Sequence, residues 1–260
     1  MAEPRAFLLD LDGTLYTGDG PIPGAREALV RLRKREISYR LISNTTSCSR
    51  ALLVQRLRGY GFEVAAEEVF TATLAGAQVA REAGWRRVAP FVPEASLVDM
   101  GDLELGGGTS GRRVDGLPDA VLVGDLGERW SYALLQEAFE YVMSGAALIA
   151  LSRDRYWLRQ GSLVLDAGPF VAGLEFASGK SAIVAGKPST AFYAKALDSM
   201  GLGSPETAAM VGDDLWSDVQ GAQRAGLQGW LVRTGKYLQA SVTESGIRPD
   251  RILESVAALG

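Results

Sequence analysis

Short apolar runs that alternate with amphipathic helical segments constrain the fold of this 260-residue chain more than any other feature. Residues 6–11 and 39–43 are apolar and predict buried strands, and helical patterns follow them at residues 24–35 and 50–57. Strands that alternate with helices are typical of a parallel sheet covered by helices on both faces. We therefore expect an α/β fold with a doubly wound parallel-sheet core.

The same alternation returns near the C-terminus. Residues 190–200 and 218–225 predict helices, while residues 208–211 and 230–232 predict strands. In sheets of this class, ligands bind at the carboxyl ends of the strands. Acidic clusters follow two of the predicted strands, so we expect a polar site at that edge of the sheet.

The middle of the chain carries strand and helix signals of its own. Residues 88–92, 120–123 and 148–151 predict strands, and residues 132–143 predict a helix. A chain of this length with 47% hydrophobic residues can form one large domain or a domain with an inserted module. We expect an inserted α/β module in this region.

A glycine-rich stretch at residues 106–111 matches the spacing of a dinucleotide-binding motif. That motif needs a hydrophobic strand before it and a helix after it. Residues 104–105 form a poor strand end, and residues 112–118 form a poor helix start. We interpret the stretch as a solvent loop and not as a cofactor site.

The chain contains no histidine, which removes the commonest acid–base group and the commonest transition-metal ligand. Serine–histidine and cysteine–histidine mechanisms are therefore excluded. With Cys48 as the only cysteine, a tight zinc site is not expected either. Any catalytic metal should bind oxygen ligands, which suits Mg2+ or Mn2+.

Charge and hydropathy limit the partners and the compartment. The formal net charge of -4 argues against broad nucleic-acid binding, which needs a basic face. No apolar run approaches the roughly 18 residues of a membrane-spanning helix, so we expect no membrane association. The first residues show no signal-peptide pattern, and a single cysteine cannot form an intrachain disulfide. We expect a cytoplasmic protein.

The strongest local signal is Asp10-Leu11-Asp12-Gly13, which directly follows an apolar run. At a strand end followed by glycine, the chain can turn and present both carboxylates near one site. One carboxylate could then act as a nucleophile while its neighbour carries a proton. The alternative is an acidic turn that caps the next helix.

Further polar residues fall near other predicted strand ends: Ser43 and Asn44, Lys187 in a Gly-Lys-Pro segment, and Asp213, Asp214 and Asp218. Each group has a simpler interpretation as a cap, a solvated lysine or an acidic loop. Their joint placement at strand ends instead indicates one active site.

Taken in order, these motifs resemble those of the haloacid dehalogenase (HAD) superfamily, and the resemblance covers nearly the whole chain. The set is Asp-x-Asp-Gly-Thr, a Ser or Thr after a strand, a Lys, and Gly-Asp-Asp with a third acid four residues on. Together with Thr-Gly-Lys at residues 234–236, it looks like subfamily IIA, the branch of nucleotide-phosphatase-like and 4-nitrophenyl-phosphatase-like proteins. The resemblance implies a Rossmann-like core and a phosphatase acting on phosphoric monoesters.

In that branch an α/β cap of the C2 type is inserted between the second and third motifs. The interval from Ser43 to Lys187 is long enough for such a domain, whereas the interval before the first helix is too short. We therefore expect a core at residues 1–77 and 183–260, with a cap at residues 78–182 that closes over the site and selects substrates.

The resemblance also implies a role for each acid. Asp10 attacks phosphorus and forms an aspartyl phosphate, and Asp12 serves as general acid and then as general base. Mg2+, or Mn2+ in its place, is held by the Asp10 carboxylate, the Asp12 carbonyl and the Asp213 carboxylate. Asp214 and Asp218 support the metal through water or outer contacts.

Phosphate binding is expected from the Ser43 hydroxyl, backbone amides near Asn44, and Lys187. The substrate is a small phosphorylated molecule, and pyrophosphate, a phosphoamino acid, a sugar phosphate and a nucleoside monophosphate all fit. Oligomeric state is open as well, although relatives often form homodimers through the cap.

One cap segment is a candidate for substrate selection. The predicted strand 148–151 leads into Arg153, Asp154, Arg155 and Tyr156, a dense set of charges and aromatics for a loop. Related phosphatases often carry Asn-Pro-Asp here, so their contacts cannot be transferred. An arginine could pair with an anionic group on the leaving side of the substrate. The alternative is a solvated edge loop with its aromatics in the cap core.

Two other functions remain as alternatives. A phosphoacceptor receiver module uses the same residue types without turnover, but it needs neither an inserted domain nor an acid–base Asp12. A phosphotransferase or mutase could be built on the same core, because a cap does not exclude transfer to a second hydroxyl.

Overall fold

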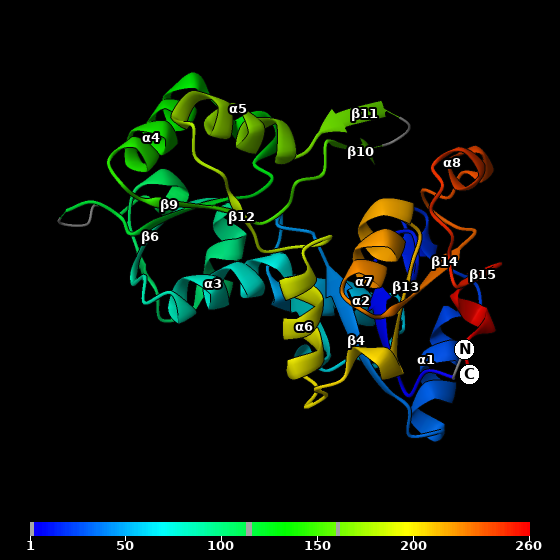
Figure 1. Ribbon diagram of the computed structural model, residues 1–260. Coiled ribbons are helices and arrows are strands. Elements are labelled where there is room, and N and C mark those ends of the chain that lie inside the picture. The colour runs from blue at the N-terminus through cyan, green and yellow to red at the C-terminus, as the bar shows by residue number, and fades with distance from the viewer. Residues whose placement is uncertain (1–2, 113–115, 160–161) are drawn as a thin grey trace. The chain divides into compact units, whose positions relative to one another are not determined.

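The computed structural model describes residues 3–112, 116–159 and 162–260 (Figure 1). The chain divides into two compact units. The first, called the core unit here, comprises Met1–Ser43, Val54–Phe70 and Lys187–Gly260. The second, called the insert unit, comprises Asn44–Leu53 and Thr71–Gly186.

A sheet of parallel strands organises the core unit. Among the described residues its six strands lie in the order β15-β14-β13-β1-β4-β5. They are β1 (Ala6–Asp10), β4 (Ser38–Ser43), β5 (Val69–Thr71), β13 (Ala208–Gly212), β14 (Gln228–Val232) and β15 (Arg251–Leu253). The pairs that join β15, β14, β13, β1 and β4 are all parallel. The predicted α/β fold with a parallel sheet is confirmed.

Strand β1 is central in this sheet, and all five of its residues are buried. An unbroken apolar strand of this kind is expected where helices cover both faces of a parallel sheet. The register places Asp10 level with Ile42 of β4 and Leu9 level with Val211 of β13. Ser43 and Asp213 therefore lie just beyond these partners, at the same edge of the sheet as Asp10.

Among its described residues the core unit has five α-helices, of which the first three lie in segments that the apolar spacing predicted. They are α1 (Ala25–Lys34), α2 (Arg50–Gly59), α6 (Thr190–Asp198), α7 (Gly221–Arg224) and α8 (Gln239–Glu244). In α1 the buried residues are Ala25, Ala28, Leu29 and Leu32, which form one stripe along the helix. The boundary between the units falls within α2. A short hairpin of β2 (Tyr16–Thr17) and β3 (Gly20–Pro21) precedes α1.

The helix predicted at residues 218–225 has a different form. Residues Leu215–Gln220 make a wider π-helical segment, and only Gly221–Arg224 are α-helical. The Asp214 side chain begins this segment by accepting hydrogen bonds from the backbone amides of Trp216 and Ser217, both at 3.0 Å. The site acid Asp218 therefore lies on an irregular turn close to the end of β13.

The insert unit has a five-stranded parallel sheet of its own among the described residues, in the order β12-β9-β8-β6-β7. Its strands are β6 (Arg87–Phe91), β7 (Glu104–Leu105), β8 (Ala120–Val123), β9 (Ala147–Ala150) and β12 (Ile183–Val184). The helices are α3 (Ala72–Glu82), α4 (Tyr132–Met143) and α5 (Gly168–Ser178).

Helices cover both faces of this second sheet. Val121 and Val123 of β8 pack in one cluster with Ala138 of α4 and Val171 of α5. Leu122, which points to the opposite face, lies against the position of Gly76 in α3. Figure 1 accordingly shows α4 and α5 on one side of the sheet and α3 on the other. The insert unit is a three-layer α/β structure.

Two segments differ from the sequence predictions. Residues 104–105, interpreted as a poor strand end, form the edge strand β7, because pairing with β6 stabilises even two residues. Tyr156 and Trp157, expected in a loop, begin strand β10 (Tyr156–Arg159), which pairs in antiparallel fashion with β11 (Ser162–Leu165). The loop after β9 is therefore shorter than expected.

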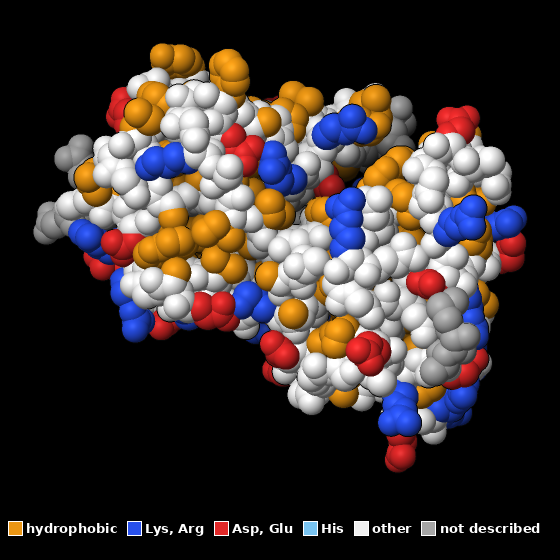
Figure 2. Space-filling view, viewed as in Figure 1, with side chains coloured by type: hydrophobic (Ala, Val, Ile, Leu, Met, Phe, Trp, Pro, Cys, Tyr) orange, Lys and Arg blue, Asp and Glu red, His pale blue; other side chains and the backbone are white. Residues whose placement is uncertain are grey.

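Charged side chains of both signs are interspersed on the face shown in Figure 2, where no single basic field forms. Within the described ranges, no helix combines the length and the apolar character that a bilayer crossing requires.

Candidate active site

Asp10, Lys187 and Asp218 form a buried ionic cluster at the carboxyl edge of the core sheet. The Lys187 Nζ atom lies 2.5 Å from Asp10 Oδ1 and 2.7 Å from Asp218 Oδ1. Asp10 comes from the end of β1, Asp218 from the π-helical segment, and Lys187 from the turn before α6. The Thr14 hydroxyl lies 3.4 Å from Asp10 Oδ2. Three segments distant in sequence therefore place their charges at one point.

Asp213 completes the cluster from the end of β13. Oxygen atoms of Asp10, Asp213 and Asp218 lie within 4.8 Å of one another, close enough to hold one cation. The backbone amide of Lys236 donates to Asp213 Oδ2 at 2.7 Å and fixes this side chain. All three acids are buried. An all-oxygen donor set is what Mg2+ prefers.

The charges of the cluster do not balance, because three carboxylates face one lysine. Burial raises the pKa of Asp10 and raises that of Asp213 well above its usual value. Burial likewise raises the pKa of Asp218 to about 7, against the opposing effect of Lys187. For Lys187, burial favours a lower pKa, but Asp10 and Asp218 hold it well above its usual value. A cation among the acids would relieve this excess of negative charge.

Asp12 and Asp214 lie beside the cluster. Asp12 is exposed, yet partial desolvation raises the pKa of its carboxyl group, with Lys236 opposing. Asp214 Oδ2 pairs with Lys236 Nζ at 3.1 Å, and its backbone amide donates to Asp218 Oδ2 at 3.0 Å. Although burial acts to raise it, Lys236 and backbone amides lower the pKa of Asp214. Asp214 thus supports the turn that carries Asp218.

The predicted phosphate-binding residues divide between the units. Ser43 is buried at the end of β4, next to the end of β1, and Lys187 belongs to the cluster itself. Asn44 begins the insert unit, where its Nδ2 atom donates to Asp154 Oδ2 at 3.2 Å. The structure thus joins a predicted phosphate-binding residue to a predicted selectivity residue.

The remaining candidates lie in the insert unit with Asp154. Arg153 forms an ion pair with Glu175 of α5 at 2.6 Å. Arg155 is exposed, and its guanidinium carbon lies 5.7 Å from the ring centre of Tyr156. The described side-chain contact of Arg155 is therefore with an aromatic ring, whereas that of Arg153 is with an acid.

Three residues for which the sequence predicted no contact with Asp213 also shape the site. A Cβ atom at Gly13 would lie 2.0 Å from Asp213 Oδ2, and one at Gly235 would lie 1.9 Å from it. Both glycines have positive φ, 84° and 59°. The third residue, Lys236, contacts both Asp213 and Asp214. The Gly-Lys pair was visible in the Thr-Gly-Lys segment, but its partner acids follow only from the pairing of β13 with β14.

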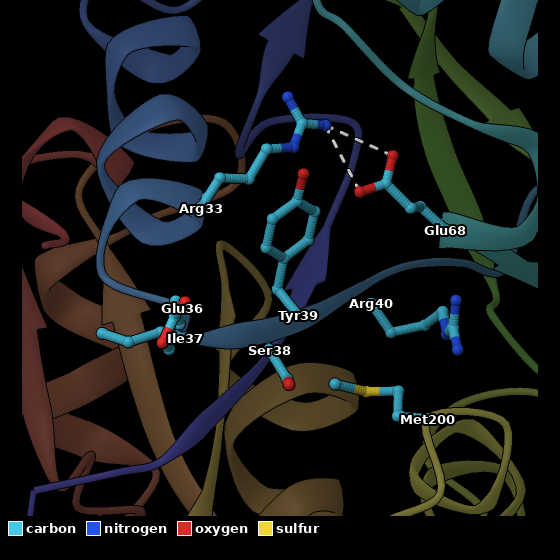
Figure 3. A pocket seen from close by; sticks show the side chains of 8 residues that line it. All are labelled: Arg33, Glu36, Ile37, Ser38, Tyr39, Arg40, Glu68 and Met200. Atoms are coloured by element: carbon cyan, nitrogen blue, oxygen red, sulfur yellow. Dashed lines mark hydrogen bonds and ion pairs between the residues drawn. The ribbon is translucent and has the colours of Figure 1, made fainter.

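A separate pocket of about 370 Å³ lies at the opposite end of β4 and contains none of the predicted site residues. Figure 3 shows Arg33 reaching across Tyr39 to Glu68, with which it pairs at 3.3 Å. The lining residues are Arg33, Glu36, Ile37, Ser38, Tyr39, Arg40, Glu68 and Met200. Its two arginines and two glutamates balance, so the pocket carries no charge preference for a phosphate.

Comparisons with known proteins show the family of the chain. Residues 7–100 match the family model of haloacid dehalogenase-like hydrolases, and residues 184–259 match a second, HAD-hydrolase-like model. The chain belongs to the haloacid dehalogenase-like hydrolases. The superfamily and the hydrolase class predicted from the motifs are thereby confirmed.

Individual relatives cover almost the entire chain. Haloacid dehalogenase-like hydrolase domain-containing protein 2 of Rattus norvegicus is 42% identical, over 94% of this chain and 89% of its own length. Phospholysine phosphohistidine inorganic pyrophosphate phosphatase of Homo sapiens is 34% identical, over 99% and 93%. The structure of glycerol phosphate phosphatase from Mycobacterium tuberculosis in complex with magnesium has a TM-score of 0.83 and 30% identity, covering 98% of this chain and 75% of that one.

Proposed function

We propose that this chain is a Mg2+-dependent phosphatase that hydrolyses a small phosphorylated molecule through an aspartyl phosphate on Asp10. The observation that carries the proposal is the cluster of Asp10, Asp213 and Asp218 around Lys187 at the strand ends. Family membership and the phosphatase names of two relatives support it.

The donor set fits a divalent metal, because buried carboxylate oxygens outnumber the single ammonium group among them. We assign the metal to the Asp10 and Asp213 carboxylates and the Asp12 carbonyl, with Asp218 and Asp214 in support. Mn2+ is the expected substitute. When bound, the ion neutralises charge that develops on the phosphoryl oxygens.

The protein side chains then carry the two chemical steps. In the first, an Asp10 oxygen bonds to phosphorus as the leaving oxygen departs, and Asp12 gives that oxygen its proton. In the second, Asp12 takes a proton from water, whose oxygen attacks phosphorus and releases Asp10 and phosphate. Lys187, the Ser43 hydroxyl and the backbone amide of Asn44 hold the non-bridging oxygens throughout.

We propose further that the insert unit is the cap that selects the substrate, with the loop after β9 as its selective element. Exposed Arg155 beside Tyr156 supports a substrate whose leaving group carries an anion. The names of the relatives, which include a pyrophosphate phosphatase and a glycerol phosphate phosphatase, support small phosphorylated substrates. We place the enzyme in the cytoplasm, since Cys48 alone cannot form an internal disulfide.

The proposal is tested by trapping the phosphoenzyme. The protein is mixed with 4-nitrophenyl phosphate and Mg2+, quenched in acid during turnover, and mapped by peptide mass spectrometry. We expect one phosphoryl group on the peptide that contains Asp10, together with continuous release of phosphate into solution. Turnover with the label on another residue would overturn the mechanism. A stable label without phosphate release would instead indicate a receiver module, and transfer to added glycerol would indicate a phosphotransferase.

A further inference from the structure

Asn44 is the only asparagine of the chain, and its side chain faces the loop after β9. Its Nδ2 atom donates to Asp154 Oδ2 at 3.2 Å, across 110 positions of sequence. Its Oδ1 atom lies where a Cβ atom at Gly186 would approach to 2.6 Å. The absence of a side chain at Gly186 therefore leaves the space in which the Asn44 amide lies. All these residues belong to the insert unit.

The loop that Asn44 contacts is also held by other groups of the insert unit. The backbone amide of Asp154 donates to Ser152 Oγ at 3.1 Å, and the backbone amide of Gly168 donates to the Asp154 carbonyl at 3.0 Å. Glu175 of α5 holds Arg153. These contacts fix the backbone of the loop and one arginine, whereas the direction of the Asp154 carboxylate is set by Asn44.

Two exposed side chains follow Asp154: Arg155 in the loop and Tyr156 at the start of β10. Arg155 is exposed, and Tyr156 retains 47% of its accessible surface. The Arg155 carbonyl accepts one hydrogen bond, from the Asp166 amide at 3.2 Å. A rotation at Asp154 strains this bond and turns the adjacent Arg155 side chain. Because a fork-shaped guanidinium contact depends on direction, such a rotation would weaken its pairing with an anion.

We infer that Asn44 is a positioning residue for substrate selection: its side-chain amide holds Asp154 and thereby the loop that presents Arg155 to an anionic leaving group. Asn44 then has two functions. Its backbone amide binds the phosphate, and its side chain orients the loop. The effect of Asn44 on substrate selection rests on the proposed phosphatase function. The anchoring of the loop by Asn44 does not depend on that function.

The anchoring of the loop is tested by trypsin, because Arg153 and Arg155 are exposed in the loop. Asn44→Asp removes the hydrogen bond to Asp154 and places two carboxylates in contact, which repel each other. Cleavage after Arg155 should therefore become about tenfold faster. The reciprocal pair Asn44→Asp with Asp154→Asn restores a donor and an acceptor in exchanged positions, so it should return cleavage to the wild-type rate. A general loss of stability would not be rescued in this way.

Two further variants complete the design. Asp154→Ala removes the acceptor of the same hydrogen bond and should also speed cleavage. This variant keeps the test decisive if Asn44→Asp fails to fold. Gln223→Ala is the matched control, because the Gln223 amide donates to the Asp250 carboxylate at 3.1 Å in the core unit. It should leave cleavage after Arg155 unchanged. Wild-type cleavage in both loop variants, or a reciprocal pair that stays as labile as Asn44→Asp, would overturn the inference.

The effect on substrate selection is tested with inorganic pyrophosphate, whose leaving group is an anion. Asn44→Asp should lower kcat/KM for pyrophosphate about tenfold, and the reciprocal pair should recover most of this loss. Rescue of loop protection without rescue of kcat/KM would confine Asn44 to a structural role and overturn the selection argument. A wild-type protein with no phosphatase activity would refute the proposed function while the trypsin result still decides the anchoring.

Discussion

Gly235→Ala tests whether the Asp213 carboxylate is positioned by the steric room that Gly235 leaves, because the substitution fills that room without changing any charge. The backbone at Gly235 has φ 59°, and an added Cβ atom would lie 1.9 Å from Asp213 Oδ2 and 2.6 Å from the Gly13 Cα atom. Ordinary contact begins at 3.4 Å, so the carboxylate oxygen would have to retreat by about 1.5 Å. The backbone amide of Lys236 holds that same oxygen at 2.7 Å, so the retreat also breaks this hydrogen bond.

The displacement is large compared with what the proposed metal site tolerates. Mg2+ requires oxygen ligands at about 2.0–2.1 Å in a nearly ideal octahedron. A misplacement of about 1 Å in a reacting assembly can lower the rate about a hundredfold. We therefore expect Gly235→Ala to lower kcat for 4-nitrophenyl phosphate at least about a hundredfold and to raise the Mg2+ concentration needed for half-maximal activity.

The assay is a Mg2+ titration of 4-nitrophenyl phosphate hydrolysis, with thermal unfolding measured in parallel. Gly246→Ala is the control, because Gly246 has φ 74° and no atom within 4 Å of the added Cβ position. Both variants carry the left-handed backbone strain of about 1–2 kcal/mol, but only Gly235→Ala contacts Asp213. Wild-type Mg2+ dependence in Gly235→Ala would refute the reasoning, as would an equal loss of activity in Gly246→Ala.

Three further outcomes are expected. Asp10→Asn should reduce turnover below about a hundredth of wild type with unchanged circular dichroism, because an amide cannot act as the nucleophile; greater residual activity would exclude a covalent role for Asp10. Activity should be lost reversibly on chelation, recover with Mg2+ or Mn2+, and be inhibited by Ca2+, whose irregular shell misplaces the attacking oxygen; full activity after exhaustive chelation would contradict this. Arg155→Ala should lower kcat/KM at least about tenfold for the best anionic substrate but less than about threefold for 4-nitrophenyl phosphate; equal losses on both would remove Arg155 from substrate selection.

The strands and helices that the sequence predicted well have strong local signals. The strand at Ala120–Val123 and the helix at Tyr132–Met143 have the predicted bounds, and the Ser131 hydroxyl caps that helix by accepting from the Leu134 amide. Helix α5 (Gly168–Ser178) was not predicted, because its residues are apolar on most sides and show no single face. The hairpin strand β11 was missed as well, since its residues are mostly exposed and lack a buried alternation.

The part of the site that depends on strand ends could be predicted from the sequence. Carboxylates directly after apolar strands must meet at one sheet edge once the strands are parallel, so Asp10 and Asp213 were predictable as neighbours. Contacts between distant segments carry no local pattern. Two such contacts are the hydrogen bond from Asn44 to Asp154 and the approach of Gly235 to Asp213. Both depend on how loops pack against one another, which the sequence pattern does not indicate.

The cluster is held in place by groups other than its own charges. Lys187 can balance only one of the three buried acids, and buried carboxylates that lack a partner are unfavourable in the folded state. Backbone amides fix two of them, since Lys236 donates to Asp213 and Asp214 donates to Asp218. Glycine leaves the space into which the Asp213 side chain extends. These contacts position the acids independently of their own charges, and the repulsion among them favours binding of a cation. A substitution that fills this space alters the site as surely as one that removes a ligand, although it changes no charge.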